Sequence, residues 1–179
     1  MGESLPPDPT DDKGASLLAR QGQHVFFTWS AQEGVEGLPI VQAKGAEFWT
    51  ADGKRWLDFV SQVYSANLGH GHRGVLEAIR AQLVSIVVAH PAAVYETKAR
   101  LGEQLAEITP PGIVKFLFTL GGAEATENAL KIARLVTGRQ KVITRYHSYH
   151  GATCGALSMS GDPRRLPFEP GMPGVVRVE

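Results

Sequence analysis

The spacing of apolar positions changes near Gly74, from short strand-like runs to the repeat of helices. Before this point, Ile40–Ala43 and Glu47–Thr50 read as strands. They lead to Asp52-Gly53, a strong tight-turn dipeptide, after which Arg55–Val60 returns along the hairpin. The first third of the chain is therefore predicted to contain a β-hairpin.

Two helices are predicted after the change of spacing. The first begins at Gly74, and the second runs from about Glu96 to Ile108, where Pro110-Pro111-Gly112 ends it. Each helix has an apolar side, which consists of Val75, Leu76, Ile79, Leu83 and Ile86 in the first, and of Leu101, Leu105 and Ile108 in the second.

A buried strand and a third helix are predicted next. Val114–Leu120 is almost continuously apolar, which is typical of a strand covered on both faces of a parallel sheet. The helix extends from about Ala123 to Thr137 and has Gly138 as its C-terminal cap. Glu127 and Lys131 are expected to form an exposed pair one turn apart. Its expected buried positions are Ala125, Ala129, Ile132, Ala133 and Val136.

Val142–Arg145 and Val175–Val178 read as two further strands. An alternation of helices and strands is typical of the beginning of an α/β sheet. Because few strands precede Glu179, the sheet is unfinished, and we expect the chain to be a fragment of a larger fold.

Composition and charge limit the classes of protein to which the chain can belong. Its 179 residues are 43% hydrophobic and 20% charged, which is ordinary for a globular protein. The 18 basic and 18 acidic residues cancel, so charge predicts neither a nucleic acid nor a membrane as partner. Residues 1–14 are polar, acidic and proline-rich, which predicts a disordered tail without a signal peptide. The single cysteine, Cys154, excludes an internal disulfide and fits a cytoplasmic location.

The glycine pair Gly121-Gly122 lies between the strand Val114–Leu120 and the third helix. A helix N-terminus presents unpaired backbone N–H groups and partial positive charge, and glycine lets an anion approach the backbone closely. A glycine pair alone is more often plain turn geometry. In this order, however, the elements form a candidate phosphate site.

Two further loops stand out, and the first of them suits a flat aromatic cofactor. Tyr146–Thr153 follows a predicted strand directly, and such loops border the ligand crevice of an open α/β sheet. The aromatic ring of Tyr149 suits stacking on another aromatic ring. Asn67–His72 is a glycine–histidine loop. Its two histidines, and the pair His147 and His150, lack the carboxylate or cysteine that would complete a set of metal ligands, so no metal is predicted.

These features together resemble the class III (ω-amino acid) aminotransferases, which use pyridoxal 5'-phosphate (PLP). The stretch from Phe59–Ser61 through Asn67–His72 resembles the family's N-terminal "DF…NLGHxHP" segment, although Arg73 replaces the usual proline. Gly121–Ala125 resembles its "SG(S/T/A)EA" phosphate turn, with Gly121 where serine is more usual. Leu135–Arg139 and Tyr149–Ser158 match the blocks that follow, so the resemblance covers about residues 20–179 in collinear order.

The resemblance implies a fold-type-I PLP-dependent transferase of the α/β class. Residues 15–72 would form the N-terminal segment and hairpin of its small domain. Residues 73–179 would form the first part of the large PLP-binding domain, with an incomplete, mostly parallel sheet. The whole protein would be a homodimer, and His90-Pro91 falls in a stretch that often reaches the neighbouring subunit's site.

The resemblance also implies roles for individual residues. Tyr149 would stack on the pyridine ring of the cofactor, and Trp29 and Tyr64 would line the substrate pocket. The residues implied in cofactor binding are Gly121, Gly122, Ala123, Tyr149 and His150.

The implied reaction is transfer of an amino group from an ω-amino acid or amine to a 2-oxo acid such as pyruvate. The family's catalytic lysine and the aspartate that pairs with the pyridine nitrogen belong to later segments, so this chain alone is expected to be inactive. Two alternatives stay open: another fold-type-I PLP enzyme, such as an aminomutase, racemase or decarboxylase, and a non-catalytic remnant.

Overall fold

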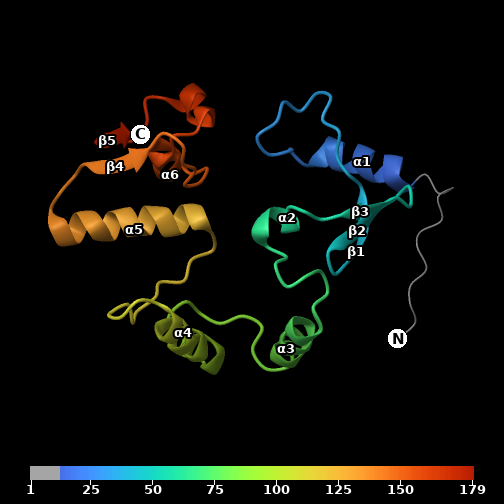
Figure 1. The fold of residues 1–179 in the computed structure, drawn as a ribbon, viewed down its shortest axis with the longest axis horizontal. Helices are drawn as coiled ribbons and strands as arrows, with labels where there is room; N and C mark the ends of the chain where they lie inside the picture. Colours follow the sequence, from blue (N-terminus) through green and yellow to red (C-terminus); the bar gives the residue numbers. More distant parts are fainter. Residues whose placement is uncertain (1–12) are drawn as a thin grey trace. The chain divides into compact units, whose positions relative to one another are not determined.

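A computed structural model describes residues 13–179, which divide into two compact units. The first unit ends at Pro91 and the second covers Ala92–Glu179 (Figure 1). The small-domain boundary expected after residue 72 concerns a larger protein and stays a prediction. Most of the predicted disordered tail, residues 1–12, lies outside the described residues, but Lys13 and Gly14 belong to a helix.

The first unit contains a helix, α1 (Lys13–His24), and a three-stranded antiparallel sheet in the order β1-β2-β3. The strands are β1 (Ile40–Lys44), β2 (Glu47–Thr50) and β3 (Arg55–Leu57), which confirms the predicted hairpin. The third strand is shorter than expected, because Asp58, Phe59 and Val60 lie outside the ladder. Helix α1 was not predicted.

The core of the first unit lies under β2. Phe48 and Ala51 are buried, and the Phe48 ring stacks on Trp56 at a centroid distance of 6.2 Å. At the β2–β3 turn, Asp52 accepts a hydrogen bond of 2.5 Å from the Thr50 hydroxyl. This bond lowers the pKa of Asp52 to about 2, with a further contribution from Lys54.

Two elements follow in the first unit: α2 (Ser61–Tyr64), which is a single left-handed turn, and the α-helix α3 (Arg73–Leu83). The helix predicted from Gly74 is thereby confirmed, although Ile86 lies beyond its end. The loop before α3 is fixed to the β1–β2 turn, since the backbone N–H and C=O groups of Gly45 and His70 pair with each other at 2.9 and 2.8 Å.

The second unit contains α4 (Glu96–Ile108), α5 (Gly122–Thr137), β4 (Val142–Arg145), α6 (Cys154–Met159), a 3₁₀ turn η1 (Pro163–Phe168) and β5 (Val175–Val178). Strands β4 and β5 pair in parallel, as the α/β pattern predicted. Gly138 caps α5 in the left-handed conformation, with φ of +68°, which also confirms the prediction.

The prediction of a strand at Val114–Leu120 is wrong, because no residue of this segment pairs with a strand among the described residues. A strand exists only with a hydrogen-bonded neighbour, and the second unit supplies just the β4–β5 pair. The expected burial of the α5 apolar side is wrong for a similar reason, since no described element covers Ala125, Ala129, Ile132, Ala133 or Val136.

The core of the second unit surrounds α6. Its buried residues are Ala156, Leu157, Ser158 and Met159, and the adjoining Ser160 is fully enclosed. This short helix lies against α5, beside the β4–β5 pair (Figure 1). The core of the second unit therefore lies next to the loop that follows β4.

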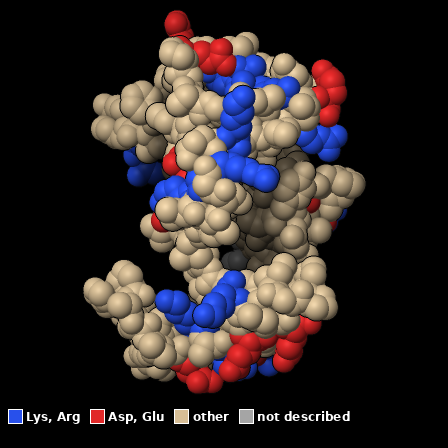
Figure 2. Space-filling view, turned by 90° about the vertical axis from the view of Figure 1, so that its left-hand side faces the viewer, with Lys and Arg blue, Asp and Glu red and all other residues tan. Residues whose placement is uncertain are grey.

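Figure 2 shows Lys and Arg side chains and Asp and Glu side chains at the surface, in places next to each other, among many uncharged side chains. Many large apolar side chains are exposed, among them those of Leu120, Leu135 and Val136. Among residues 13–179, no helix has the length and apolar character needed to cross a membrane.

Candidate cofactor site

The first turn of α5 has the geometry of an anion site. Gly121 is its N-cap in an extended conformation, and Gly122 and Ala123 begin the helix. The backbone N–H groups of Gly122 and Ala123 have no acceptor among the described residues, since the helical pattern begins with Ala125 N–H donating to Gly121 C=O at 3.0 Å. A Cβ placed on Gly121 or Gly122 would meet nothing within 4 Å, so the backbone is open to a ligand.

Side chains of the same segment fix this turn. The hydroxyl of Thr119 donates to the C=O of Gly121 at 3.1 Å, and the carboxylate of Glu124 accepts from the N–H of Leu120 at 3.0 Å. Glu124 thereby satisfies one N–H group before the helix and leaves the next amides unpaired.

The loop after β4 packs directly on this turn through Gly151, which is buried and has φ of +135°. A Cβ at Gly151 would lie 2.5 Å from the Cβ and 2.7 Å from the Cα of Ala123. Only glycine fits such an approach. The structure thus brings together Gly121–Ala123 and the loop that carries Tyr149 and His150.

The Tyr149 ring lies beside a cation. The guanidinium of Arg164 sits over it, 4.5 Å from the ring centroid. Asp162 holds this guanidinium by accepting from its Nε and Nη2 atoms, each at 2.8 Å. These bonds lower the pKa of Asp162 to about 2 and raise that of Arg164.

His150 is half-buried, and Ser160 and Thr144 hold it in place. Its N–H donates to the Ser160 hydroxyl at 2.9 Å, and its Nε2 atom lies 3.4 Å from the Thr144 hydroxyl. Thr144 itself is buried and donates to the C=O of Met159 at 2.6 Å. The loop is thereby tied to the end of α6.

Glu127 has a partner that the sequence did not reveal. Its Oε1 atom accepts from the Thr153 hydroxyl and from the N–H groups of Gly155 and Ala156, the latter two at 3.2 and 3.3 Å. The bond from Thr153 is the main cause that lowers the pKa of Glu127. The predicted pair with Lys131 is confirmed only in part: Lys131 contributes through its charge to the lowered pKa of Glu127, but the Glu127 carboxylate is half-buried and forms no direct ion pair with Lys131 in the described structure.

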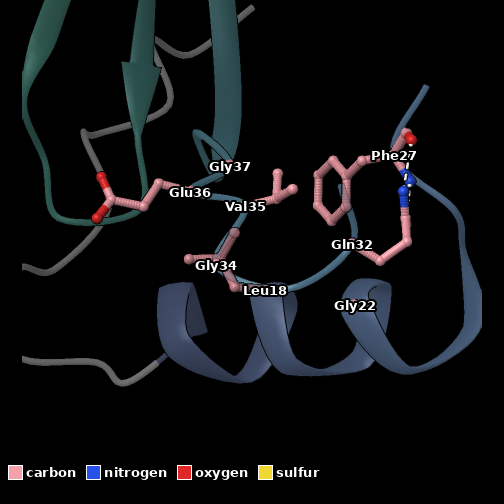
Figure 3. A pocket seen from close by; sticks show the side chains of 8 residues that line it. All are labelled: Leu18, Gly22, Phe27, Gln32, Gly34, Val35, Glu36 and Gly37. Atoms are coloured by element: carbon pink, nitrogen blue, oxygen red, sulfur yellow. Dashed lines mark hydrogen bonds between the residues drawn. The ribbon is translucent and has the colours of Figure 1, made fainter. Parts of the chain in front are cut away.

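Trp29 belongs to the first unit and lies in a loop closed by Gln32. The side-chain amide of Gln32 accepts from the N–H of Phe27 at 2.9 Å and donates to its C=O at 2.8 Å (Figure 3). Trp29, between these ends, has φ of +54°. A pocket of about 440 Å³ adjoins the loop, lined by Leu18 and Gly22 of α1 and by Phe27, Gln32, Gly34, Val35, Glu36 and Gly37 (Figure 3).

Tyr64 also belongs to the first unit and ends a left-handed turn. Ser61, Gln62, Val63 and Tyr64 all have positive φ, between +48° and +67°. L-residues rarely adopt this conformation in succession, and each costs about 1–2 kcal/mol. The Tyr64 side chain is exposed.

The carboxylate of Asp58, whose side chain is 4% exposed, helps to hold this turn. It accepts from the N–H of Gln62 at 3.3 Å and from the His70 ring at 2.8 Å. The bond to His70 lowers the pKa of Asp58. His70 is thus engaged with Asp58, and His72 accepts from the N–H of Val75 at the start of α3. The described residues contain no cluster of three or more metal-ligating side chains.

Comparison with known proteins finds similarity to aminotransferases. Residues 29–179 match the family model described as aminotransferase class-III. The chain is 38% identical to a probable 4-aminobutyrate aminotransferase of Bacillus subtilis, over 92% of its length and 39% of the relative's. It is 39% identical to an acetylornithine aminotransferase of Streptomyces coelicolor, over 80% of its length and 35% of the relative's.

Among solved structures, the chain matches the taurine:2-oxoglutarate aminotransferase of Bifidobacterium kashiwanohense, in complex with PLP and glutamate. The TM-score is 0.86 at 37% identity, over 99% of this chain and 39% of that one. This likeness confirms the predicted fold class, part of a fold-type-I PLP-dependent transferase. The chain spans about two fifths of the length of the relatives that it matches.

Proposed function

The chain belongs to the class-III aminotransferase family, and from this premise we propose that the whole protein is a PLP-dependent aminotransferase. It transfers an amino group from an ω-amino acid or amine to a 2-oxo acid such as pyruvate. The relatives named for 4-aminobutyrate and taurine support a donor whose amino group is on a terminal carbon. In family terms, residues 15–72 belong to the small domain and 73–179 to the large domain of a homodimer.

One observation carries this proposal: the unpaired N–H groups of Gly122 and Ala123 lie under the loop that bears Tyr149, joined by the contact of Gly151 with Ala123. A phosphate accepts hydrogen bonds from such amides and is stabilised by the helix dipole. The residues present therefore fit the cofactor, which when bound supplies an electron sink for the carbon that carries the amino group.

In this proposal, the residues of this chain bind the cofactor and orient it. Gly121, Gly122 and Ala123 hold the phosphate, and the ring of Tyr149 stacks on the flat face of the cofactor. His150 supports the same loop from its position beside Thr144.

The substrate pocket is assigned to two aromatic side chains. Trp29, presented by the Gln32-closed loop, and Tyr64, presented by the left-handed turn, supply its walls.

The catalytic lysine and the aspartate for the pyridine nitrogen lie outside these 179 residues. Lys115, Lys131 and Lys141 are all exposed, and none lies in the first turn of α5 or in the loop of Tyr149. The 179-residue chain alone therefore transfers no amino group, and measurable transfer by it would contradict this part of the proposal.

The test is to read the gene past the codon for Glu179 and to purify its whole product. The product is incubated with PLP, one donor among 4-aminobutyrate, taurine and N-acetylornithine, and either pyruvate or 2-oxoglutarate. Formation of alanine or glutamate supports the proposal and identifies the substrates. A product that binds PLP but transfers no amino group points to an aminomutase, racemase or decarboxylase, and one that binds no PLP points to a non-catalytic remnant.

A further inference from the structure

We propose that Glu127 is a positioning residue, which clamps the loop of Tyr149 against the phosphate turn of α5. The identity of the ligand rests on the function proposed above, but the clamp itself rests on contacts within the second unit. One carboxylate oxygen of Glu127 accepts three hydrogen bonds, from the Thr153 hydroxyl and from the N–H groups of Gly155 and Ala156.

Helical spacing places this carboxylate where a clamp is needed. Ala123 and Glu127 are four residues apart on α5 and so share one face of the helix. Ala123 meets Gly151, and Glu127 meets the segment from Thr153 to Ala156. The C-terminal part of the loop, from Gly151 to Thr153, is thus held at two neighbouring points by the same helix face.

The charge of Glu127 suits this role. The first N–H groups of α6 have no intrahelical partner, and the carboxylate satisfies those of Gly155 and Ala156. Hydrogen bonds to an ionised acceptor are roughly twice as strong as neutral ones. The contacts lower the pKa of Glu127, so the carboxylate stays ionised at neutral pH.

The clamp fixes the separation between the amides of Gly122 and Ala123 and the ring of Tyr149 before any ligand binds. A ligand that touches both places gains affinity from this preorganisation, because less ordering remains to be done on binding. A ligand that touches the amides alone gains nothing from it. PLP and inorganic phosphate therefore distinguish the two cases.

The experiment compares Glu127→Ala, Glu127→Gln and Thr153→Val in the whole protein, with Glu103→Ala on the exposed surface of α4 as the matched control. Hydrogen exchange of the ligand-free protein measures the clamp, and fluorescence titration measures Kd for PLP and for inorganic phosphate. In E127A we expect exchange at Gly155 and Ala156 to be faster by about tenfold or more and Kd for PLP to rise about tenfold, with less than about a twofold change for phosphate. E127Q, which keeps an amide oxygen as acceptor, should fall between E127A and the wild type, and E103A should match the wild type.

Unchanged exchange at Gly155 and Ala156 in E127A overturns the clamp, whether or not PLP binds. Faster exchange with unchanged Kd for PLP overturns the positioning role and leaves Glu127 as a structural residue. A wild type that binds no PLP defeats the proposed function, while its exchange data still decide the clamp. Should E127A fail to fold, T153V decides the same questions, because it removes one donor and keeps the side-chain shape.

Discussion

Gly151→Ala tests the close approach that joins the two halves of the candidate cofactor site. The φ of +135° at Gly151 is a conformation that costs an alanine about 1–3 kcal/mol. The added methyl would also lie 2.5 Å from the Cβ of Ala123, and relieving such overpacking costs about 1–3 kcal/mol more. The expected loss of about 2–6 kcal/mol is a large part of the roughly 5–15 kcal/mol that stabilises a typical domain.

Urea unfolding followed by far-ultraviolet circular dichroism measures this loss. With a slope of about 1–3 kcal/mol per M, a loss of 2 kcal/mol or more lowers the midpoint by roughly 0.7 M or more. The control is Gly102→Ala within α4, where the new Cβ meets nothing within 4 Å. Alanine is favoured over glycine in a helix by about 0.5–1 kcal/mol, so this variant should gain stability.

The reasoning is refuted if G151A keeps the wild-type midpoint while G102A raises it. In that case the loop after β4 does not rest on Ala123, and the proximity of Tyr149 to the phosphate turn loses its main support.

Three further predictions concern single residues. Ala123→Pro removes one of the N–H groups that we propose bind the phosphate, at a first-turn position where a helix tolerates proline. The protein should fold but bind PLP about tenfold more weakly or worse, and titration with an unaltered Kd would exclude this amide. The pKa of Asp52 is lowered to about 2 in the folded state from an ordinary 3.8, so its bonds stabilise the hairpin above about pH 4. This contribution to stability is lost as the pH falls from about 4 to about 2. Carboxyl NMR should give a titration midpoint near 2 for Asp52, and a midpoint near 3.8 contradicts the bond from Thr50. Val63→Gly should raise the free energy of unfolding by about 1 kcal/mol, because glycine adopts positive φ without strain, whereas a destabilised variant would show that Val63 is not left-handed.

Local signals predicted most elements of the chain. The bounds of α4 agree with the structure at both ends, because an apolar stripe and the break at Pro110-Pro111-Gly112 are both local in sequence. The cap at Gly138 and the strand β4 could be predicted for the same reason. Val114–Leu120 could not, since its pairing depends on neighbouring strands rather than on its own residues.

Only part of the candidate site could be predicted from the sequence. The phosphate turn is a contiguous motif, so Gly121, Gly122 and Ala123 could be singled out from it. The contact between Glu127 and Thr153 joins residues 26 positions apart, and no spacing rule relates them. Helical spacing instead suggested Lys131 as the partner of Glu127, because the period of a helix describes its own surface and not what packs on it.

The left-handed turn from Ser61 to Tyr64 bears on how this protein can vary. Its backbone conformation is held by hydrogen bonds to Asp58 and between main-chain groups, none of which involves the Tyr64 side chain. Any unbranched L-residue at position 64 meets the same backbone penalty as tyrosine, so exchanging that side chain adds little further strain. Position 64 is therefore a place where drift or laboratory evolution can change the side chain that we assign to the substrate pocket at small cost to the fold.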